Sequence, residues 1–512
     1  MCPGSGTESL ESINREPLII KEDDDNDEGM RTKPEGKFMQ AFFKHRPVRE
    51  EVLSLGKIGG PIVMTTLLLN SRSALSMLFL GRLGRTELAG GSLALACANI
   101  TGISVIKGLT TGMDPICGQA YGARKFSVLS QIFQKTVCLL LLVSIFISLF
   151  WRNMEPIFLR LGQNPDISRV ATSYMLYSVP ELLAQAILHP MRSFLRAQDR
   201  TSPITISAIF AVVLHLPISY LLANHLKLGV KGVALALALN TFNMNLGLLI
   251  YIFMSEEALK PWHGFSFDSF FHGWCSLLSL AVPSCLQVCL EWWWYEIMLF
   301  LCGLLGNPEI SVSAMGILIQ TTGILYIFPF AINNSLATRV GHELGAGQPS
   351  QAQWTAKIGI CLALAFGLAA FIVMTAIKSF WGKLFTDEPQ VLHLISTTLP
   401  LLGLCEIGNS PQTSAWGVLT GQARPKDGAR INLYSFYLLG LPVAVLSTFR
   451  FEVGFHGPWY GLLVAQFCCA CMMIITLIRT DWELQAKRAA ELTRAAENEE
   501  DDLESALISN ED

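Results

Sequence analysis

Three glutamates lie inside long apolar stretches of this 512-residue chain. Glu291 stands in CLEWWWYEIM, near the middle of an apolar run from residue 274 to 305, Glu406 stands in LCEIGNS, and Glu181 in SVPELLA. A charge at bilayer depth is costly unless it is paired or hydrated, so such residues are functional candidates by default. A carboxyl group in these surroundings can bind and release a proton near physiological pH, which makes all three candidates for proton coupling or substrate binding.

The first of these stretches has two faces if it is helical. At about 100° per residue, Glu291 shares a face with Trp294 and Tyr295, whereas Glu296 lies about 140° around the helix with the other two tryptophans. We therefore expect Glu291, Trp294 and Tyr295 to line a cavity, and Glu296 to meet a neighbouring helix or a hydrated groove. Stacking on a ligand and packing within the protein or its interfacial belt are both open for the tryptophans.

The second stretch places Glu406 and Asn409 three residues apart, on one face with Thr413 and Trp416. A carboxyl group that takes up a proton on one side of a membrane and loses it on the other is what a proton-coupled antiporter needs. Glu406 is therefore predicted to be a proton or substrate site, with a structural ion pair as the alternative.

Other ionisable residues in apolar segments supply candidate partners. Arg72, Lys107 and Arg192 could neutralise the glutamates, of which Glu181 follows a proline near a helix kink. Arg72 could instead attract an organic anion or extend its charge toward the membrane surface. His215 is interpreted first as a hydrogen-bonded packing residue and only second as part of a site.

These residues need long apolar helices to position them. The chain is 51% hydrophobic and 15% charged, whereas soluble domains carry about 25% charged residues. A membrane-spanning helix needs about 20 apolar residues. Twelve segments qualify, near residues 52–80, 87–113, 128–150, 170–190, 203–224, 230–254, 273–305, 310–336, 355–378, 391–417, 432–449 and 458–478. The sequence thus predicts an all-α membrane protein with twelve transmembrane helices.

Composition excludes several other classes of protein and site. The net charge of −4 and the lack of a basic stripe argue against nucleic-acid binding. The 13 cysteines are scattered through apolar segments without histidines at zinc spacing, so we expect neither disulfides nor a metal site. No secretory signal and no convergent set of catalytic residues is evident, so we expect neither cleavage nor enzymatic activity.

An even number of spans puts both termini on one side. Lys and Arg are more frequent in the stretches that share a side with the N-terminus, which favours a cytoplasmic location for both ends. The sequence does not decide between the plasma membrane and endomembranes such as the late endosome, Golgi or vacuole.

The two halves of the chain repeat each other. CGQAYGARK, from Cys117, matches VGHELGAGQ, from Val340, and further glycine and proline pairs recur at nearly the same offset. Six spans in each half give parallel topology and a pseudo-two-fold axis along the membrane normal, which is typical of transporters. We therefore predict two pseudo-symmetric six-helix bundles. The expected divisions are an N-terminal tail (1–50), an N-lobe (51–254), a linker (255–272), a C-lobe (273–480) and an acidic C-terminal tail (481–512).

Several motifs resemble those of the multidrug and toxic compound extrusion (MATE) family, in its plant DETOXIFICATION branch. They are GRLGRTELAGGSLA (81–94), MDPICGQAYGA (113–123), CLEWWWYE (289–296), RVGHELGAGQP (339–349) and GVLTGQARP (417–425). The resemblance covers about residues 47–482. It implies two bundles of six helices, alternating access, and export of xenobiotics, secondary metabolites or hormone-like molecules against a proton gradient.

The resemblance also assigns residues. The seventh-span glutamate of the family falls on Glu291, whereas its tenth-span acid falls on Asn409, so Glu406 one turn earlier is the expected substitute. No acid lies between Glu51 and Glu87, so the first-span aspartate of many prokaryotic relatives is missing, and we do not expect a sodium site in the first lobe.

The sequence thus predicts a secondary transporter that exports organic compounds by proton antiport. We expect it to use the proton gradient rather than a cofactor, and to work as a monomer in the lipid bilayer. The alternative is a lipid-linked flippase of the same superfamily, which would need a cavity with several arginines for a pyrophosphate group.

Overall fold

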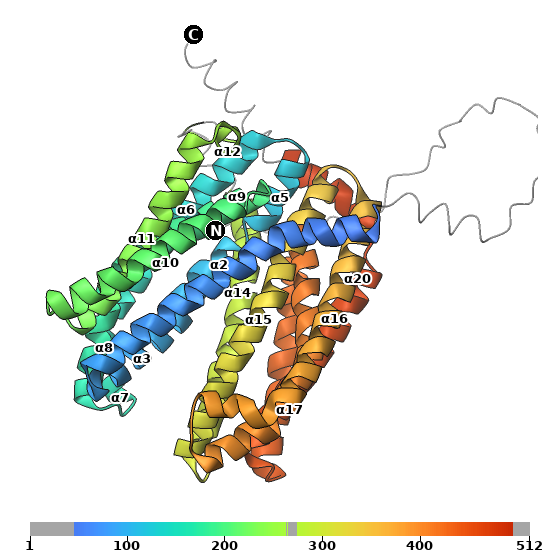
Figure 1. Cartoon of the computed structure of the whole chain (residues 1–512). Coiled ribbons are helices and arrows are strands. Elements are labelled where there is room, and N and C mark those ends of the chain that lie inside the picture. The colour runs from blue at the N-terminus through green and yellow to red at the C-terminus, as the bar shows by residue number, and fades with distance from the viewer. Residues whose placement is uncertain (1–45, 263, 265–273, 495–512) are drawn as a thin grey trace, which may run out of the picture. The chain divides into compact units, whose positions relative to one another are not determined.

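The computed structural model describes residues 46–262, 264 and 274–494 (Figure 1). Within these ranges all regular secondary structure is helical, and eleven helices are long and apolar enough to cross a membrane. The residues from Pro47 onward form one compact unit. Its helices fall into two bundles, which we call the N-lobe and the C-lobe.

The N-lobe contains the helices from Val48 to Leu259. Its members are α2 (Val48–Leu83), α3 (Arg85–Ala98), α4 (Ser104–Thr110), α5 (Asp114–Gly122), α6 (Phe126–Trp151), α7 (Met154–Arg160), α8 (Pro165–Tyr177), α9 (Val179–Ala197), α10 (Ser202–Tyr220), α11 (Val230–Met254) and α12 (Glu256–Leu259). Short π-helical segments, Asn99–Ile103 and Leu221–His225, join α3 to α4 and extend α10. Trp151, Phe158 and Tyr174 are fully buried at the centre of its apolar core.

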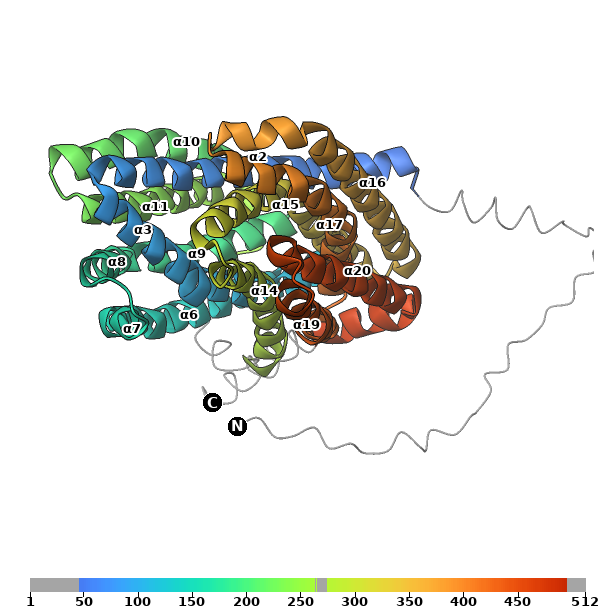
Figure 2. The same ribbon diagram turned by 90° about the horizontal axis from the view of Figure 1, so that it is seen from below.

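The C-lobe contains the helices from Trp274 to Ile478. Its members are α14 (Trp274–Gly303), α15 (Pro308–Gly345), α16 (Pro349–Trp381), α17 (Pro389–Gly421), α18 (Pro425–Asn432), α19 (Leu441–Val445) and α20 (Gly457–Ile478). Two π-helical segments, Leu433–Gly440 and Leu446–Arg450, make α18 and α19 parts of one span. Trp294, Phe436 and Trp459 lie at the centre of a second apolar core. In Figure 2, α14 and α15 lie between the N-lobe helices and the outer helices α16, α17 and α20.

The prediction of an all-α membrane protein with two six-helix bundles is confirmed. Eleven predicted spans match continuous apolar helices or helices joined by π-helical turns. The span predicted at 170–190 is instead two helices, α8 and α9, which meet at Ser178 just before Pro180. Proline cannot donate its own backbone hydrogen bond, which accounts for a break at this position.

The predicted boundaries of the two tails differ from the boundaries seen in the structure. Helix α2 begins at Val48, so the last residues of the predicted N-terminal tail belong to the first span; residues 1–45 lie outside the described residues. The acidic tail is helical over residues 482–494, where Trp482 and Ala489 are buried in the C-lobe core. Most of the predicted linker and residues 495–512 lie outside the described residues.

The two lobes meet along one half of the spans. Helix α2 contacts α15 and α16, α4 contacts α14, and α5 contacts α15 and α17. The close approaches at Gly118, Gly122 and Gly345 lie at the same ends of the helices as the contact of Glu51, at the start of α2, with Arg339. We call this side of the protein the Glu51 side.

Candidate functional site

Two carboxyl groups of the C-lobe are buried near the middle of their helices. Glu291 on α14 is 7% exposed and Glu406 on α17 is 1% exposed. Each carboxylate is near enough to the other to repel it electrostatically, and both act on the hydroxyl groups of Tyr295 and Tyr326. The predicted residues Glu291, Tyr295 and Glu406 therefore belong to one cluster, which we call the Glu291 group.

Asn409 is also part of this group. Its amide nitrogen lies 3.2 and 3.1 Å from the two carboxylate oxygens of Glu406, to which it donates. The hydroxyl of Thr413, one turn further on, lies 3.5 Å from the amide oxygen of Asn409. The predicted shared face of α17 is thus present in the fold, and Glu406 makes no ion pair among the residues that the structure describes.

Glycines allow the helices around Glu406 to approach closely. A Cβ atom at Gly367 of α16 would lie 2.6 Å from the backbone oxygen of Glu406, and one at Gly408 would lie 3.1 Å from the backbone of α20. Both distances are shorter than ordinary van der Waals contact, so a side chain at Gly367 would require the backbone to shift and one at Gly408 would require a small adjustment. This packing holds the Glu406 segment of α17 between α16 and α20.

The tryptophans of the α14 motif have three different environments. Trp294 is fully buried, with its ring centroid 5.5 Å from that of Phe436 and 6.3 Å from that of Tyr437. This placement favours packing in the lobe over stacking on a ligand. Trp293 is 41% exposed at the outer surface. Trp292, which helical spacing puts on the face of Glu296, lies under the ammonium group of Lys107 from the N-lobe, 4.7 Å from its ring centroid.

The remaining C-lobe candidate, Glu296, is partly buried. Its carboxylate is near enough to act electrostatically on Cys97 of α3 in the N-lobe. This agrees with the prediction that Glu296 meets a neighbouring helix rather than the Glu291 group.

In the N-lobe, Arg72 and Glu181 form a buried ion pair at 3.3 Å. The guanidinium of Arg72 also donates to the side-chain oxygens of Asn240 and Thr241, at 2.9 and 2.8 Å. Arg72 is only 8% exposed, so neither of its predicted roles, an exposed anion site or a charge extended to the membrane surface, fits this placement. One turn along, the Nε2 atom of His215 lies 3.1 Å from the hydroxyl of Ser76, which agrees with the packing interpretation.

We expect Arg72→Met to destabilise the protein by about 3–5 kcal/mol, because it leaves the Glu181 carboxylate buried without its partner. The double variant Arg72→Met/Glu181→Leu removes both charges and should recover most of this loss. Thermal unfolding of the purified protein, monitored by size-exclusion chromatography, measures both effects. Equal stability of the single variant and the wild type would contradict the role of the pair in the fold.

On the Glu51 side, a buried cluster of charges joins the lobes. Glu51 of α2 is fully buried and lies 3.2 Å from the guanidinium of Arg339, which also contacts Glu343 at 2.8 Å. The hydroxyl of Thr355 on α16 donates to Glu51 at 2.9 Å. Helix α2 therefore carries in its first turn an acidic residue, one position before the predicted start of the first span, that binds the C-lobe.

The repeated glycine motifs face each other beside this cluster. A Cβ atom at Gly118 would lie 3.5 Å from the Cα atom of Gly341. One at Gly122 would lie 2.2 Å from the carbonyl oxygen of His342, and one at Gly345 only 2.0 Å from that of Gln119. The corresponding segments of the two halves thus pack backbone to backbone, as two parts related by a pseudo-two-fold axis between them would. We call this contact the glycine seam.

Some residues of the region between the lobes had no clear signal in the sequence. Phe330 on α15 lies 4.5 Å from the ammonium group of Lys107, measured to its ring centroid, and Tyr326 stands one turn earlier on the same helix. Both are aromatic residues in an apolar span, where packing is the ordinary expectation. Phe330 is distinguished only by its position against a charged group of the other lobe, and Tyr326 only by its interaction with Glu291 and Glu406.

Two helical lobes that meet on one side, with buried carboxyl groups beyond their contact, are the architecture of membrane transporters with repeated halves. The MatE family model matches residues 61–221 and 283–446, one segment in each lobe. The chain therefore belongs to the MatE family of transporters.

Relatives of known name support this assignment. The chain is 64% identical to Protein DETOXIFICATION 53 of Arabidopsis thaliana over 88% of its own length and 92% of the relative. It is 52% identical to Protein DETOXIFICATION 49 of the same plant, over 88% of this chain and 90% of that one. Among solved structures, the crystal structure of the eukaryotic MATE transporter AtDTX14 matches with a TM-score of 0.83 at 28% identity, covering 87% of this chain and 99% of that one.

Proposed function

We propose that this transporter exports organic compounds in exchange for protons, and that Glu291 and Glu406 carry the protons. The observation that supports this most directly is that two buried carboxyl groups interact electrostatically and have no ion-pair partner among the described residues. The buried Glu181 of the N-lobe, by contrast, is already neutralised by Arg72. A carboxyl group in an apolar site can exchange its proton near physiological pH, so the C-lobe pair is suited to this task.

Exchange requires that the site opens to one side of the membrane at a time. The Glu51 cluster and the glycine seam hold the lobes together on the Glu51 side, which leaves the Glu291 group to be reached from the other side in this conformation. Rocking of one lobe against the other about a site between them is the general mechanism of transporters with repeated halves. The buried ion pairs of the cluster would have to separate in each cycle.

The excess of Lys and Arg on the side of the N-terminus supports a cytosolic Glu51 side, with both termini in the cytosol. Export then carries the compound from the cytosol to the outside or into an organelle, while protons move inward. We propose that one chain suffices for this cycle, that no cofactor is bound, and that the substrates are xenobiotics, secondary metabolites or hormone-like molecules.

Transport in proteoliposomes with an imposed pH gradient tests this function. A panel of uncharged, cationic and anionic fluorescent compounds identifies what the wild type moves. With the best of these, Glu406→Gln should lower the initial rate by at least about tenfold, equivalent to about 1.4 kcal/mol. The reason is that one of the two proton-binding groups is lost while Glu291 remains.

Glu309→Gln is the matched control, because Glu309 is an exposed glutamate in the first turn of α15. It should leave the rate unchanged. If no compound accumulates in response to the pH gradient, or if Glu406→Gln transports like the wild type, the proposed role of the carboxyl pair is wrong.

A further inference from the structure

Lys107 is the one residue that places a positive charge against aromatic rings of the opposite lobe among the described residues. It lies on α4 of the N-lobe, and its ammonium nitrogen is 4.7 Å from the ring centroid of Trp292 and 4.5 Å from that of Phe330, both in the C-lobe. Two aromatic faces within about 6 Å of a cation form the kind of site that binds organic ammonium ions. Here a side chain of the protein already fills it.

No carboxylate lies within ion-pair distance of Lys107 in the described part of the chain. Glu291 is near enough to attract its ammonium group only at longer range. Lys107 is also partly buried, so water compensates its charge only in part. The rings of Trp292 and Phe330 therefore supply much of the local stabilisation of this charge.

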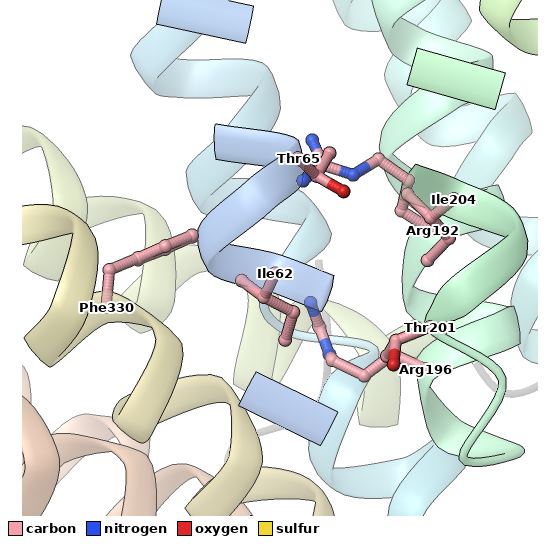
Figure 3. Close-up of a pocket in the computed structure, with 7 residues that line it drawn as sticks. All are labelled: Ile62, Thr65, Arg192, Arg196, Thr201, Ile204 and Phe330. Atoms are coloured by element: carbon pink, nitrogen blue, oxygen red, sulfur yellow. The ribbon is translucent and has the colours of Figure 1, made fainter. Parts of the chain in front are cut away.

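A second cation lies nearby. Arg192 of α9 lines a small pocket between α2, α9, α10 and α15, together with Thr65 and Phe330. Figure 3 shows its guanidinium group extended toward Thr65, with Phe330 on the opposite side of α2. Arg192 has no ion-pair partner among the described residues, whereas its neighbour Arg196 is bound to Asp114 at 2.6 Å. Lys107 and Arg192 are close enough to repel each other.

The charges around the site set which substrates it can accept. In the proposed antiport cycle, the substrate binds after Glu291 and Glu406 have released their protons, so two negative groups then balance the positive groups of Lys107 and Arg192. An organic cation would find the aromatic site occupied by an ammonium group, and an anion would approach two carboxylates. A substrate without net charge avoids both penalties.

We propose that Lys107 is a built-in cation that determines specificity: it fills the aromatic site of Trp292 and Phe330, excludes organic cations, and restricts the carrier to uncharged planar compounds. This inference rests on the proposed function, because the charge balance is that of the deprotonated carboxyl pair. Removal of the ammonium group should open the aromatic site to cations. Lys107 would thus decide the charge of the substrate without taking part in proton transfer.

Three probes with one scaffold test the proposal: 4-methylumbelliferyl glucoside is uncharged, the glucuronide is an anion, and the glucosaminide is largely a cation at neutral pH, where the carboxyl pair can still release its protons. Binding is measured in detergent by energy transfer from tryptophan to the coumarin ring. The wild type should bind the glucoside at least about tenfold more tightly than the glucosaminide, as expected for repulsion between two nearby charges. Lys107→Gln should improve binding of the glucosaminide by at least about tenfold and change binding of the glucoside much less.

Lys107→Arg retains the charge and should still exclude the glucosaminide. Lys231→Gln is the matched control, since Lys231 also lies over an aromatic ring, 5.3 Å from the centroid of Tyr177, but at the other end of the N-lobe. A gain of cation binding cannot result from misfolding, so Lys107→Gln gives a clear answer even if its yield falls.

The binding assay separates this inference from the proposed function. If the wild type binds the glucoside selectively but a pH gradient drives no transport, proton antiport is wrong and the role of Lys107 stands. Tighter binding of the glucosaminide or the glucuronide than of the glucoside by the wild type would overturn the substrate class, as would failure to bind any of the three. Unchanged cation binding in Lys107→Gln would overturn the role of Lys107.

Discussion

Glu291→Gln should reduce transport driven by a pH gradient to the level of protein-free liposomes, while insertion and abundance stay those of the wild type. Glutamine has nearly the shape of a protonated glutamate, so the packing of α14 is kept, but it cannot release a proton. Glu291 interacts electrostatically with Tyr295, Tyr326, Glu406 and the ammonium group of Lys107, and Glu296, the other carboxyl group of α14, cannot replace it. The carrier should therefore remain fixed in its proton-loaded form.

The same substitution at Glu296 is the control, because Glu296 is on the same helix but acts on Cys97 of α3 instead. Glu296→Gln should keep most of the wild-type rate. Both variants are compared by initial rates in proteoliposomes, with protein orientation checked by protease digestion. Full activity of Glu291→Gln would exclude it as a proton carrier and leave Glu406 as the remaining candidate on the C-lobe.

Helical periodicity predicted the partners of Glu406 better than those of Glu291. On α17, Asn409 is one turn from Glu406, so a contact within one helix could be inferred from spacing alone. On α14, spacing placed Glu291, Trp294 and Tyr295 together, but it could not tell which part of that face meets the core of the lobe. Trp294 packs against Phe436, which lies 142 positions further along the chain, and no local pattern predicts such a contact.

The charged residues of the N-lobe show the same limit of sequence-based prediction, because their partners depend on how the helices pack. The free-energy cost of placing a charge at bilayer depth correctly identified Arg72 and Glu181 as residues that need an explanation. Which cation pairs with which anion depends on how α2 and α9 pack, and three cations were available for three glutamates. The fold resolves this by pairing Arg72 with Glu181 and by leaving Lys107 on the face toward the C-lobe.

The internal repeat, in contrast, predicted both the relation between the two halves and residues of the contact between them. Matching glycines at 118 and 341 predicted two related halves, and in the structure these two residues face each other. Glycine in both copies follows from the geometry, because side chains at the contact would keep the backbones of the lobes apart. The glycine seam is therefore the part of the interface where a single added methyl group should have the largest effect.

Gly345→Ala should prevent closure of the Glu51 side and so abolish most transport. Its Cβ atom would lie 2.0 Å from the carbonyl oxygen of Gln119 in the other lobe, so the lobes can meet only after the backbone shifts. Overpacking of this kind costs about 1–3 kcal/mol. Applied to the balance between closed and open states, that cost changes their ratio about 5–150-fold. Each lobe should still fold, because the clash arises only between the lobes.

Gly341→Ala is the matched control in the same helix, since its Cβ atom would lie 3.3 Å from Gly118, which is tight but requires only a small shift. The native Cys117 is a local probe of the seam, because it is fully buried and directly precedes Gly118. Labelling by a maleimide, followed for the Cys117 peptide by mass spectrometry, should be faster in Gly345→Ala and nearly unchanged in Gly341→Ala. If Gly345→Ala transports normally and Cys117 stays protected, the seam does not limit access, and the Glu51 cluster alone would have to hold that side closed.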